Sequence, residues 1–217
     1  MGQRHHHYER AFEAMARKLR VPCVSVNEAK RALVPGKDSY RFAGANGKTV
    51  SRSLKNFDFV LYGPGSNLLV DVKGRRLAPA AKAARVGRSS SGRSPRLESW
   101  VSAEDVRSML AWQSLFGPDF EAAFVFYYSS DQPPAGDLFD EIFGFEGMWY
   151  APRIVAVDDY AREMKTRSKR WATVDLPREA FEAHAGPLLS PGGDVRRLES
   201  APCSPAPWLE PVAGVAV

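Results

Sequence analysis

Two apolar, β-rich segments in the middle of the sequence each contain an aspartate. Asp58 lies in the segment from Leu54 to Tyr62, and Asp71 lies in the segment from Asn67 to Lys73. The turn at 63–66, Gly-Pro-Gly-Ser, predicts a hairpin that makes the two segments neighbouring strands. Burying an ionised carboxylate without a partner is strongly unfavourable. The pattern therefore calls for a nearby positive group, either Lys73 or a divalent cation.

Carboxylates gathered in this way are typical ligands of Mg²⁺ or Mn²⁺, which prefer hard oxygen donors. Glu9, on a predicted N-terminal helix, is the natural third ligand beside Asp58 and Asp71. Glu13 is the alternative, but Arg17 follows it by four residues and is its expected partner. A metal held there would polarise a phosphodiester oxygen and lower the pKa of a bound water.

Lys73 shares the strand face of Asp71, two residues away. Close to a metal it would orient the attacking water or stabilise the charge that grows on the phosphate, and its neutral form would instead accept a proton. The sequence leaves these roles open. The structural alternative is an ordinary Asp71–Lys73 ion pair that contributes little stability, with Glu9 as a solvated helix residue.

A polar side chain on a later predicted helix faces the same way as that helix's apolar residues. Gln113 lies on the stripe formed by Val106, Met109, Leu110 and Phe116, so we expect it to point inward. A buried amide needs hydrogen-bond partners. The site carboxylates or a metal-bound water would supply them, and bonding to the backbone at the margin of the stripe is the alternative.

The elements expected to position these residues form an α/β fold with a mixed central β-sheet flanked by helices. An apolar stripe predicts a helix over 6–20. A second helix, over 102–116, starts at Ser102 with Asp105 at the capping-box position. Further expected elements are an extended segment at 21–26, a brief helix at 27–33, a solvated loop with some strand pairing at 36–53, strands at 121–128, 147–151 and 153–157, a helix at 158–169, an edge strand at 171–175 and a helix at 178–185.

A glutamate in a first helix, Asp58 on a strand and Asp71-Val72-Lys73 on the next strand resemble the PD-(D/E)XK (restriction-endonuclease-like) nuclease superfamily. The resemblance covers about residues 6–128 and includes the core order α-β-β-(β)-α-β. It implies metal-dependent phosphodiester hydrolysis, with Glu9, Asp58 and Asp71 binding the metal and Lys73 assisting the water. Gln113 matches the polar residue that members often carry on the following helix. One departure is Phe57, where many members have proline.

The segment His7-Tyr8-Glu9-Arg10-Ala11-Phe12-Glu13 also resembles the signature of the uncharacterised bacterial HYExAFE family. This second resemblance implies no mechanism of its own.

Positive charge follows the catalytic candidate Lys73 directly. No acidic residue occurs between Asp71 and Glu98, and we expect 75–97 to be a mobile basic loop. The side chains expected to contact a polyanion are Arg75, Arg76, Lys82, Arg85 and Arg88. Such contacts bind phosphates without reading sequence and weaken as salt rises. A second basic cluster, Lys165, Arg167, Lys169 and Arg170, would extend this contact surface for a polyanion, but the favoured interpretation is a solvated surface.

The composition suits one globular domain of a cytoplasmic protein. The chain has 217 residues, 44% of them hydrophobic, and a formal net charge of +5. We expect the domain to cover 1–185 and a Pro-rich flexible tail to cover 186–217. Cys23 and Cys203 have no disulfide framework, which favours a reducing compartment, and no apolar run is long enough to span a membrane.

These observations predict a metal-dependent nuclease that uses Mg²⁺ or Mn²⁺ and acts on nucleic acid, with DNA favoured over RNA. One alternative is a catalytically inactive, nuclease-like nucleic-acid-binding protein. Another is an interaction module that recruits a partner through its Pro-rich tail.

Overall fold

The computed structural model describes residues 3–26, 40–43, 49–52, 54–64, 67–77, 97–134, 139–191 and 193–198. Within these ranges a six-stranded sheet has the order β1-β4-β5-β7-β9-β8. Its strands are β1 (Cys23–Ser25), β4 (Phe59–Tyr62), β5 (Asn67–Arg76), β7 (Phe120–Ser130), β8 (Phe143–Phe145) and β9 (Met148–Ala156). β5 and β7 run parallel, and the other neighbours are antiparallel, so the sheet is mixed as expected.

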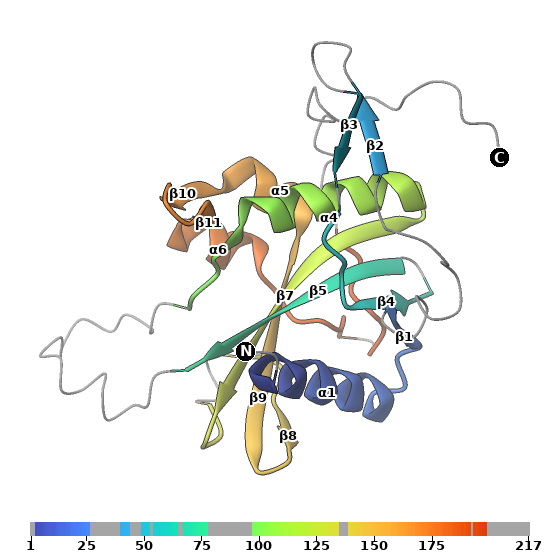
Figure 1. Cartoon of the computed structure of the whole chain (residues 1–217). Helices are drawn as coiled ribbons and strands as arrows, with labels where there is room; N and C mark the ends of the chain where they lie inside the picture. Colours follow the sequence, from blue (N-terminus) through green and yellow to red (C-terminus); the bar gives the residue numbers. More distant parts are fainter. Residues whose placement is uncertain are drawn as a thin grey trace, which may run out of the picture.

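Helices cover both faces of this sheet (Figure 1). α1 (Gln3–Lys18) lies on one face, and α4 (Ala103–Phe116), α5 (Val157–Glu163) and α6 (Arg178–His184) contribute to the core on the other. Alternation along β5 follows from this: Leu68 and Val70 face α1, whereas Leu69 faces α4. Asp71 and Lys73 therefore point toward α4.

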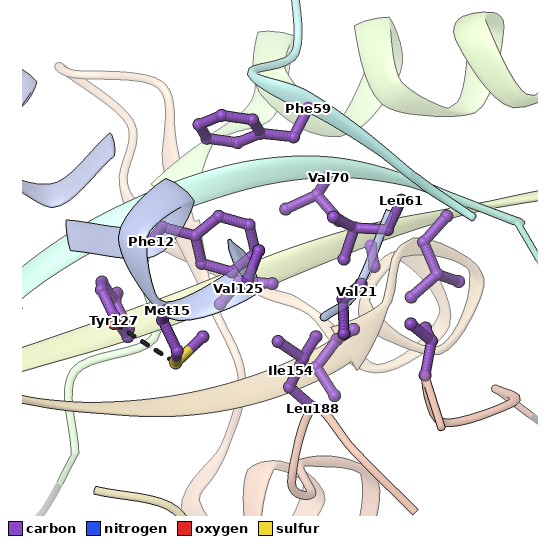
Figure 2. Packing of buried hydrophobic residues seen from close by; sticks show 14 of the residues in the cluster. Phe12, Met15, Val21, Phe59, Leu61, Val70, Val125, Tyr127, Ile154 and Leu188 are labelled. Atoms are coloured by element: carbon purple, nitrogen blue, oxygen red, sulfur yellow. Dashed lines mark hydrogen bonds between the residues drawn. The ribbon is translucent and has the colours of Figure 1, made fainter. Parts of the chain in front are cut away.

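The core beneath α1 is built from residues far apart in the chain. Figure 2 shows Phe12 and Met15 packed among Val70 and Val125 of the sheet, with the Tyr127 hydroxyl donating to the Met15 sulfur at 3.4 Å. Each such buried side chain stabilises the fold by about 1.5–3 kcal/mol. The apolar stripe that predicted this helix is thus the face that holds it on the sheet.

Two smaller sheets accompany the main one within the described residues. β2 (Tyr40–Ala43) pairs with β3 (Thr49–Arg52), within the segment where the sequence predicts a loop with some strand pairing. A three-stranded sheet has the order β10-β11-β6, with β10 (Lys165–Ser168), β11 (Thr173–Asp175) and β6 (Val101–Ser102). Because β6 runs directly into α4, this sheet lies at the N-terminal end of that helix (Figure 1).

Several predicted elements are confirmed and others are wrong in extent. The capping box at the start of α4 forms as expected, with Ser102 and Asp105 exchanging hydrogen bonds. The two strands predicted around Pro152 are the single strand β9, because Pro152 lies beyond the last residue paired with β8, where its missing N–H costs no ladder bond. The helix predicted at 158–169 ends at Glu163 and is followed by β10. The brief helix predicted at 27–33 lies outside the described residues.

The flexible tail predicted from residue 186 does not begin there. Gly186 pairs with Ile154 of β9, and Leu188, Val195 and Leu198 are buried in the core beneath α1. Both oxygens of Glu141 accept the backbone N–H groups of the 188–189 segment at 2.8 Å. Proline content was a poor predictor of where the tail begins, because the apolar residues scattered among the prolines pack against distant parts of the fold. The remaining tail and any partner it recruits concern residues 199–217, outside the described ranges.

No helix in the described part of the chain combines the length and apolarity needed to cross a bilayer.

The first turns of α1 are anchored to three strands by aromatic residues. The ring of Tyr8 occupies the space where a Cβ at Gly74 of β5 would lie. The Tyr8 hydroxyl is 2.9 Å from Ser129 Oγ of β7, and His7 Nδ1 is 3.1 Å from the hydroxyl of Tyr150 in β9. These contacts set the position of Glu9, the next residue of the helix.

We expect Gly74→Ala to lower the free energy of unfolding by about 1–3 kcal/mol, because the added methyl overlaps the Tyr8 ring. Urea denaturation measures this change. Gly144→Ala in β8 is the matched control, since its Cβ would meet Trp149 at an ordinary 3.4 Å. In a Tyr8→Ala background most of the cost should disappear, and an undiminished cost there would contradict the assignment of Tyr8 as the obstacle.

Candidate active site

Asp58 lies at the point where β4 begins. Its backbone N–H donates to Val70 O at 2.9 Å, and its carboxylate accepts the Val72 N–H at 2.7 Å. The Asp58 carboxylate thus takes the place of a main-chain carbonyl as acceptor, and it extends the hydrogen bonding between β4 and β5. The strand predicted over 54–62 is shorter than expected and starts at Phe59. Its alternation breaks at Asp58, so that Phe57 and Phe59 pack on opposite faces of the sheet.

Asp71 and Lys73 lie on the adjoining strand, on the face toward α4. Asp71 is 6% exposed, and its Oδ2 is 2.8 Å from Lys73 Nζ. The ion pair that the sequence leaves as the structural alternative is therefore present. The register pairs Phe59 with Val70, so the next positions along the two strands are Asp58 and Asp71. Two carboxylates are thereby held beside each other in a largely buried place.

This proximity changes the acidity of Asp58. Its pKa is raised to about 8, chiefly by burial and next by the charge of Asp71, with a smaller effect from Glu9. The Val72 N–H and Lys73 act in the opposite direction. Glu9 is half-buried on α1 and near enough for its charge to act on Asp58. Glu13 forms its expected pair with Arg17, at 2.5 Å.

Asp105, which the sequence assigns only to helix capping, also reaches the site. Its Oδ2 is 3.5 Å from Lys73 Nζ, and its Oδ1 is 3.0 Å from Lys55 Nζ. Lys55 in turn lies 3.3 Å from Glu104 and donates to Ser102 Oγ at 3.0 Å. The sequence did contain a signal for this contact: Asp105 is an acidic residue in the first turn of the helix that covers the strand face of Asp71 and Lys73.

The two carboxylates around Lys73 determine its charge. Burial lowers the pKa of Lys73, but Asp71 and Asp105 outweigh that effect and the pKa is raised. Lys73 is therefore protonated at neutral pH. This favours a role as a positive group over the role of proton acceptor, which the sequence left open.

Gln113 does not join these residues. Its amide nitrogen donates to Asp158 Oδ2 at 2.8 Å, and its amide oxygen accepts the Ala122 N–H at 2.6 Å. The prediction that Gln113 bonds to the site carboxylates is wrong, and the alternative of backbone bonding is closer to what is found. Both ends of the amide are used to fasten α4 to β7 and α5.

A metal site of three carboxylates is not formed by the described residues. No group of three or more His, Cys, Asp or Glu side chains there lies close enough together to hold an ion. The donor chemistry nonetheless fits Mg²⁺ or Mn²⁺ at the Asp58–Asp71 pair, because two hard carboxylates are held side by side at an electrostatic cost that a cation would relieve. Glu9 lies at the margin of this pair.

The basic residues predicted to bind nucleic acid fall into two groups. Arg75 and Arg76 belong to the end of β5, so the predicted basic loop starts later than expected. Arg75 is half-buried, donates to the carbonyl of Trp100 and lies 4.2 Å from the centre of its ring. Arg76 is exposed and pairs with Asp131 at 2.6 Å. Lys82, Arg85 and Arg88 lie outside the described residues.

Comparison with known proteins gives one distant structural similarity. The chain is similar to Hjc, a Holliday junction resolvase from the hyperthermophilic archaeon Archaeoglobus fulgidus, with a TM-score of 0.42 and 15% sequence identity over 82% of this chain and 92% of that one. No protein-family model matches the chain, and no curated protein matches it. The resemblance of the N-terminal segment to the HYExAFE family is therefore not confirmed.

The raised pKa of Asp58 predicts how stability depends on pH in the metal-free protein. The folded state holds a proton that the unfolded state releases near pH 4, so the free energy of unfolding should fall between about pH 4 and pH 8. Asp58→Asn retains an acceptor for the Val72 N–H and removes the contribution of Asp58 to this slope. Burial also raises the pKa of Asp71, so part of the slope remains in the variant. We expect the variant to gain about 1–3 kcal/mol relative to the wild type at pH 8, less than the full shift implies because Asp58 is partly solvated.

Urea denaturation in EDTA at a series of pH values measures this difference. Asp119→Asn, at an exposed carboxylate, is the control and should keep the wild-type slope. Parallel curves for the wild type and Asp58→Asn would contradict the prediction.

Proposed function

We propose that this protein is a metal-dependent nuclease that hydrolyses phosphodiester bonds in nucleic acid, with DNA favoured over RNA. The observation that carries the proposal is the grouping of Asp58, Asp71 and Lys73 where β4 and β5 separate. Two adjacent carboxylates with an ammonium group 2.8 Å from one of them combine a cation-binding pair with a positive group. The basic composition of the chain, with a net charge of +5, is compatible with a polyanionic substrate.

In this mechanism Asp58 and Asp71 would hold Mg²⁺ or Mn²⁺, and Glu9 would add negative charge from α1. When bound, such an ion polarises the phosphate and lowers the pKa of a coordinated water. Lys73, protonated and held between Asp71 and Asp105, would stabilise the negative charge that develops on the phosphate oxygens. The Val72 N–H keeps Asp58 oriented.

A nuclease-like protein that binds nucleic acid without cleaving it is the second candidate. Two observations favour it. Lys73 is already neutralised by two carboxylates, and no cluster of three metal ligands forms among the residues that the structure describes. The two candidates differ in turnover and in metal binding, and both can be measured.

We expect the purified protein to cleave labelled DNA with MgCl₂ or MnCl₂ and to stop in EDTA. Asp71→Asn and Lys73→Met should each reduce the rate by about 100-fold or more, because they remove a cation ligand and the charge near the phosphate. Asp119→Asn should cleave as the wild type does. A wild-type rate for Asp71→Asn would rule out the proposed site, and salt-sensitive binding with no cleavage in either metal would favour the second candidate.

Metal binding has a readout independent of turnover. Mg²⁺ or Mn²⁺ should raise the melting temperature of the wild type, because a ligand that binds only the folded state stabilises it. The increase should be lost in Asp58→Asn and Asp71→Asn and kept in Asp119→Asn. An equal increase in all four proteins would place the cation elsewhere.

A further inference from the structure

The turn between β10 and β11 presents a large aromatic ring among positive charges. We call residues 168–172, Ser-Lys-Arg-Trp-Ala, the Trp171 turn. The Trp171 side chain is 69% exposed, and the guanidinium of Arg170 lies 5.1 Å from the centre of its ring. Lys165, Arg167 and Lys169 are also exposed. Single exposed apolar residues are common, but a Trp embedded in a basic strip is not explained by solubility alone.

The charge of this strip is only partly balanced. Glu98 lies 3.8 Å from Arg167, and Asp175 is opposite Lys165 in the β10–β11 register. Both acids lie beside residues of β10, and neither belongs to the Trp171 turn. From residue 164 to residue 174 the sequence contains no acidic residue, so the Trp171 turn carries net positive charge.

Backbone contacts hold the Trp171 turn in one conformation. The Trp171 N–H donates to Ser168 Oγ at 3.3 Å, and the Ala172 N–H donates to Lys169 O, also at 3.3 Å. Ala172 has a left-handed backbone (φ 46°), and its carbonyl accepts the N–H of Ala103, the first residue of α4, at 2.8 Å. The backbone that carries the ring therefore has little conformational entropy left to lose when the turn binds a ligand.

The same contacts connect the Trp171 turn to the candidate active site. Ala103 precedes Asp105 by two residues, about 3 Å along the helix axis, and Asp105 contacts Lys73. Between the turn and β5, the ring of Trp100 has the guanidinium of Arg75 at 4.2 Å and that of Arg167 at 5.3 Å from its centre. Trp100 thus links Arg75 at the end of β5 to Arg167 of β10.

We propose that the Trp171 turn binds an unpaired segment of the nucleic-acid substrate, with Trp171 stacking on a base and Lys165, Arg167, Lys169 and Arg170 contacting the adjacent phosphates. This inference rests on the proposed function and makes its substrate more specific: the strand enters the site from a region with unpaired nucleotides. A flat exposed ring among cations suits a base with its phosphates, because every base offers a π-face. In a duplex the base faces are covered by their neighbours, so such a ring would find no base to stack on.

The test measures binding of the full-length protein to a fluorescent single-stranded oligonucleotide and to a blunt duplex of the same sequence, in EDTA so that nothing is cleaved. Trp171→Ala should weaken single-strand binding by about 5- to 100-fold, the usual effect of losing one stacked base. Duplex binding should change less than about twofold, since it depends on charge. Trp171→Phe should retain most of the single-strand affinity, and Trp171→Leu should not.

Leu115→Ala is the matched control, because Leu115 is an apolar residue of α4 that is 55% exposed, outside the Trp171 turn. It should bind both ligands as the wild type does. Wild-type single-strand affinity in Trp171→Ala, equal losses for both ligands, or no binding by the wild type would each overturn the inference. Equal losses would indicate a surface that senses charge alone.

Cleavage by the wild type in MgCl₂ is scored separately. If cleavage occurs but Trp171→Ala binds normally, the inference fails and the proposed function stands. If binding depends on Trp171 but no metal supports cleavage, the proposed function fails and the Trp171 turn remains a binding surface.

Discussion

The electrostatic repulsion between the buried carboxylates of Asp58 and Asp71 is the constraint on which the rest of the candidate site depends. Two carboxylates occupy adjacent positions at the start of β4 and in the middle of β5, where burial and mutual repulsion raise the pKa of Asp58 to about 8. The fold tolerates this arrangement because Lys73 compensates Asp71, while the Val72 N–H satisfies one oxygen of Asp58. The remaining negative charge at this site is relieved only in part by its own residues, an arrangement that favours the approach of a cation.

The surrounding elements hold these charges in place from both faces of the sheet. On one face, Tyr8 packs on Gly74 and sets the distance between α1 and the sheet, so that the charge of Glu9 acts on Asp58. On the other face, the capped first turn of α4 brings Asp105 to Lys73, with Lys55 behind it. The result is a row of alternating charges from Lys55 to Asp71. β6 runs directly into α4, and the Ala172 carbonyl accepts the N–H of Ala103, so the Trp171 turn contacts the same first turn of the helix.

Much of the fold could be read from local patterns, and the failures have physical causes. The helices α1 and α4 were predictable because each carries an apolar stripe, and the capping box marked where α4 begins. Gln113 was misassigned because the helix pattern gives the direction of its side chain but not its hydrogen-bond partner. That partner, Asp158, comes from a distant segment of the chain. Leu188, Val195 and Leu198 were assigned to a tail because they follow no periodic pattern. Their burial depends on packing against β9 and α1, which the local sequence does not show.

The sequence by itself determined that Asp58 lies beside the strand that carries Asp71-Val72-Lys73, with a glutamate-bearing helix before them, because hairpin turns are local properties of the chain. Only the tertiary structure decided that Lys73 is shared between Asp71 and Asp105, that three carboxylates do not gather within the described residues, and that Trp171 is presented beside the start of α4. Distances between side chains on different elements depend on how the elements pack, and packing is a property of the whole core rather than of any segment.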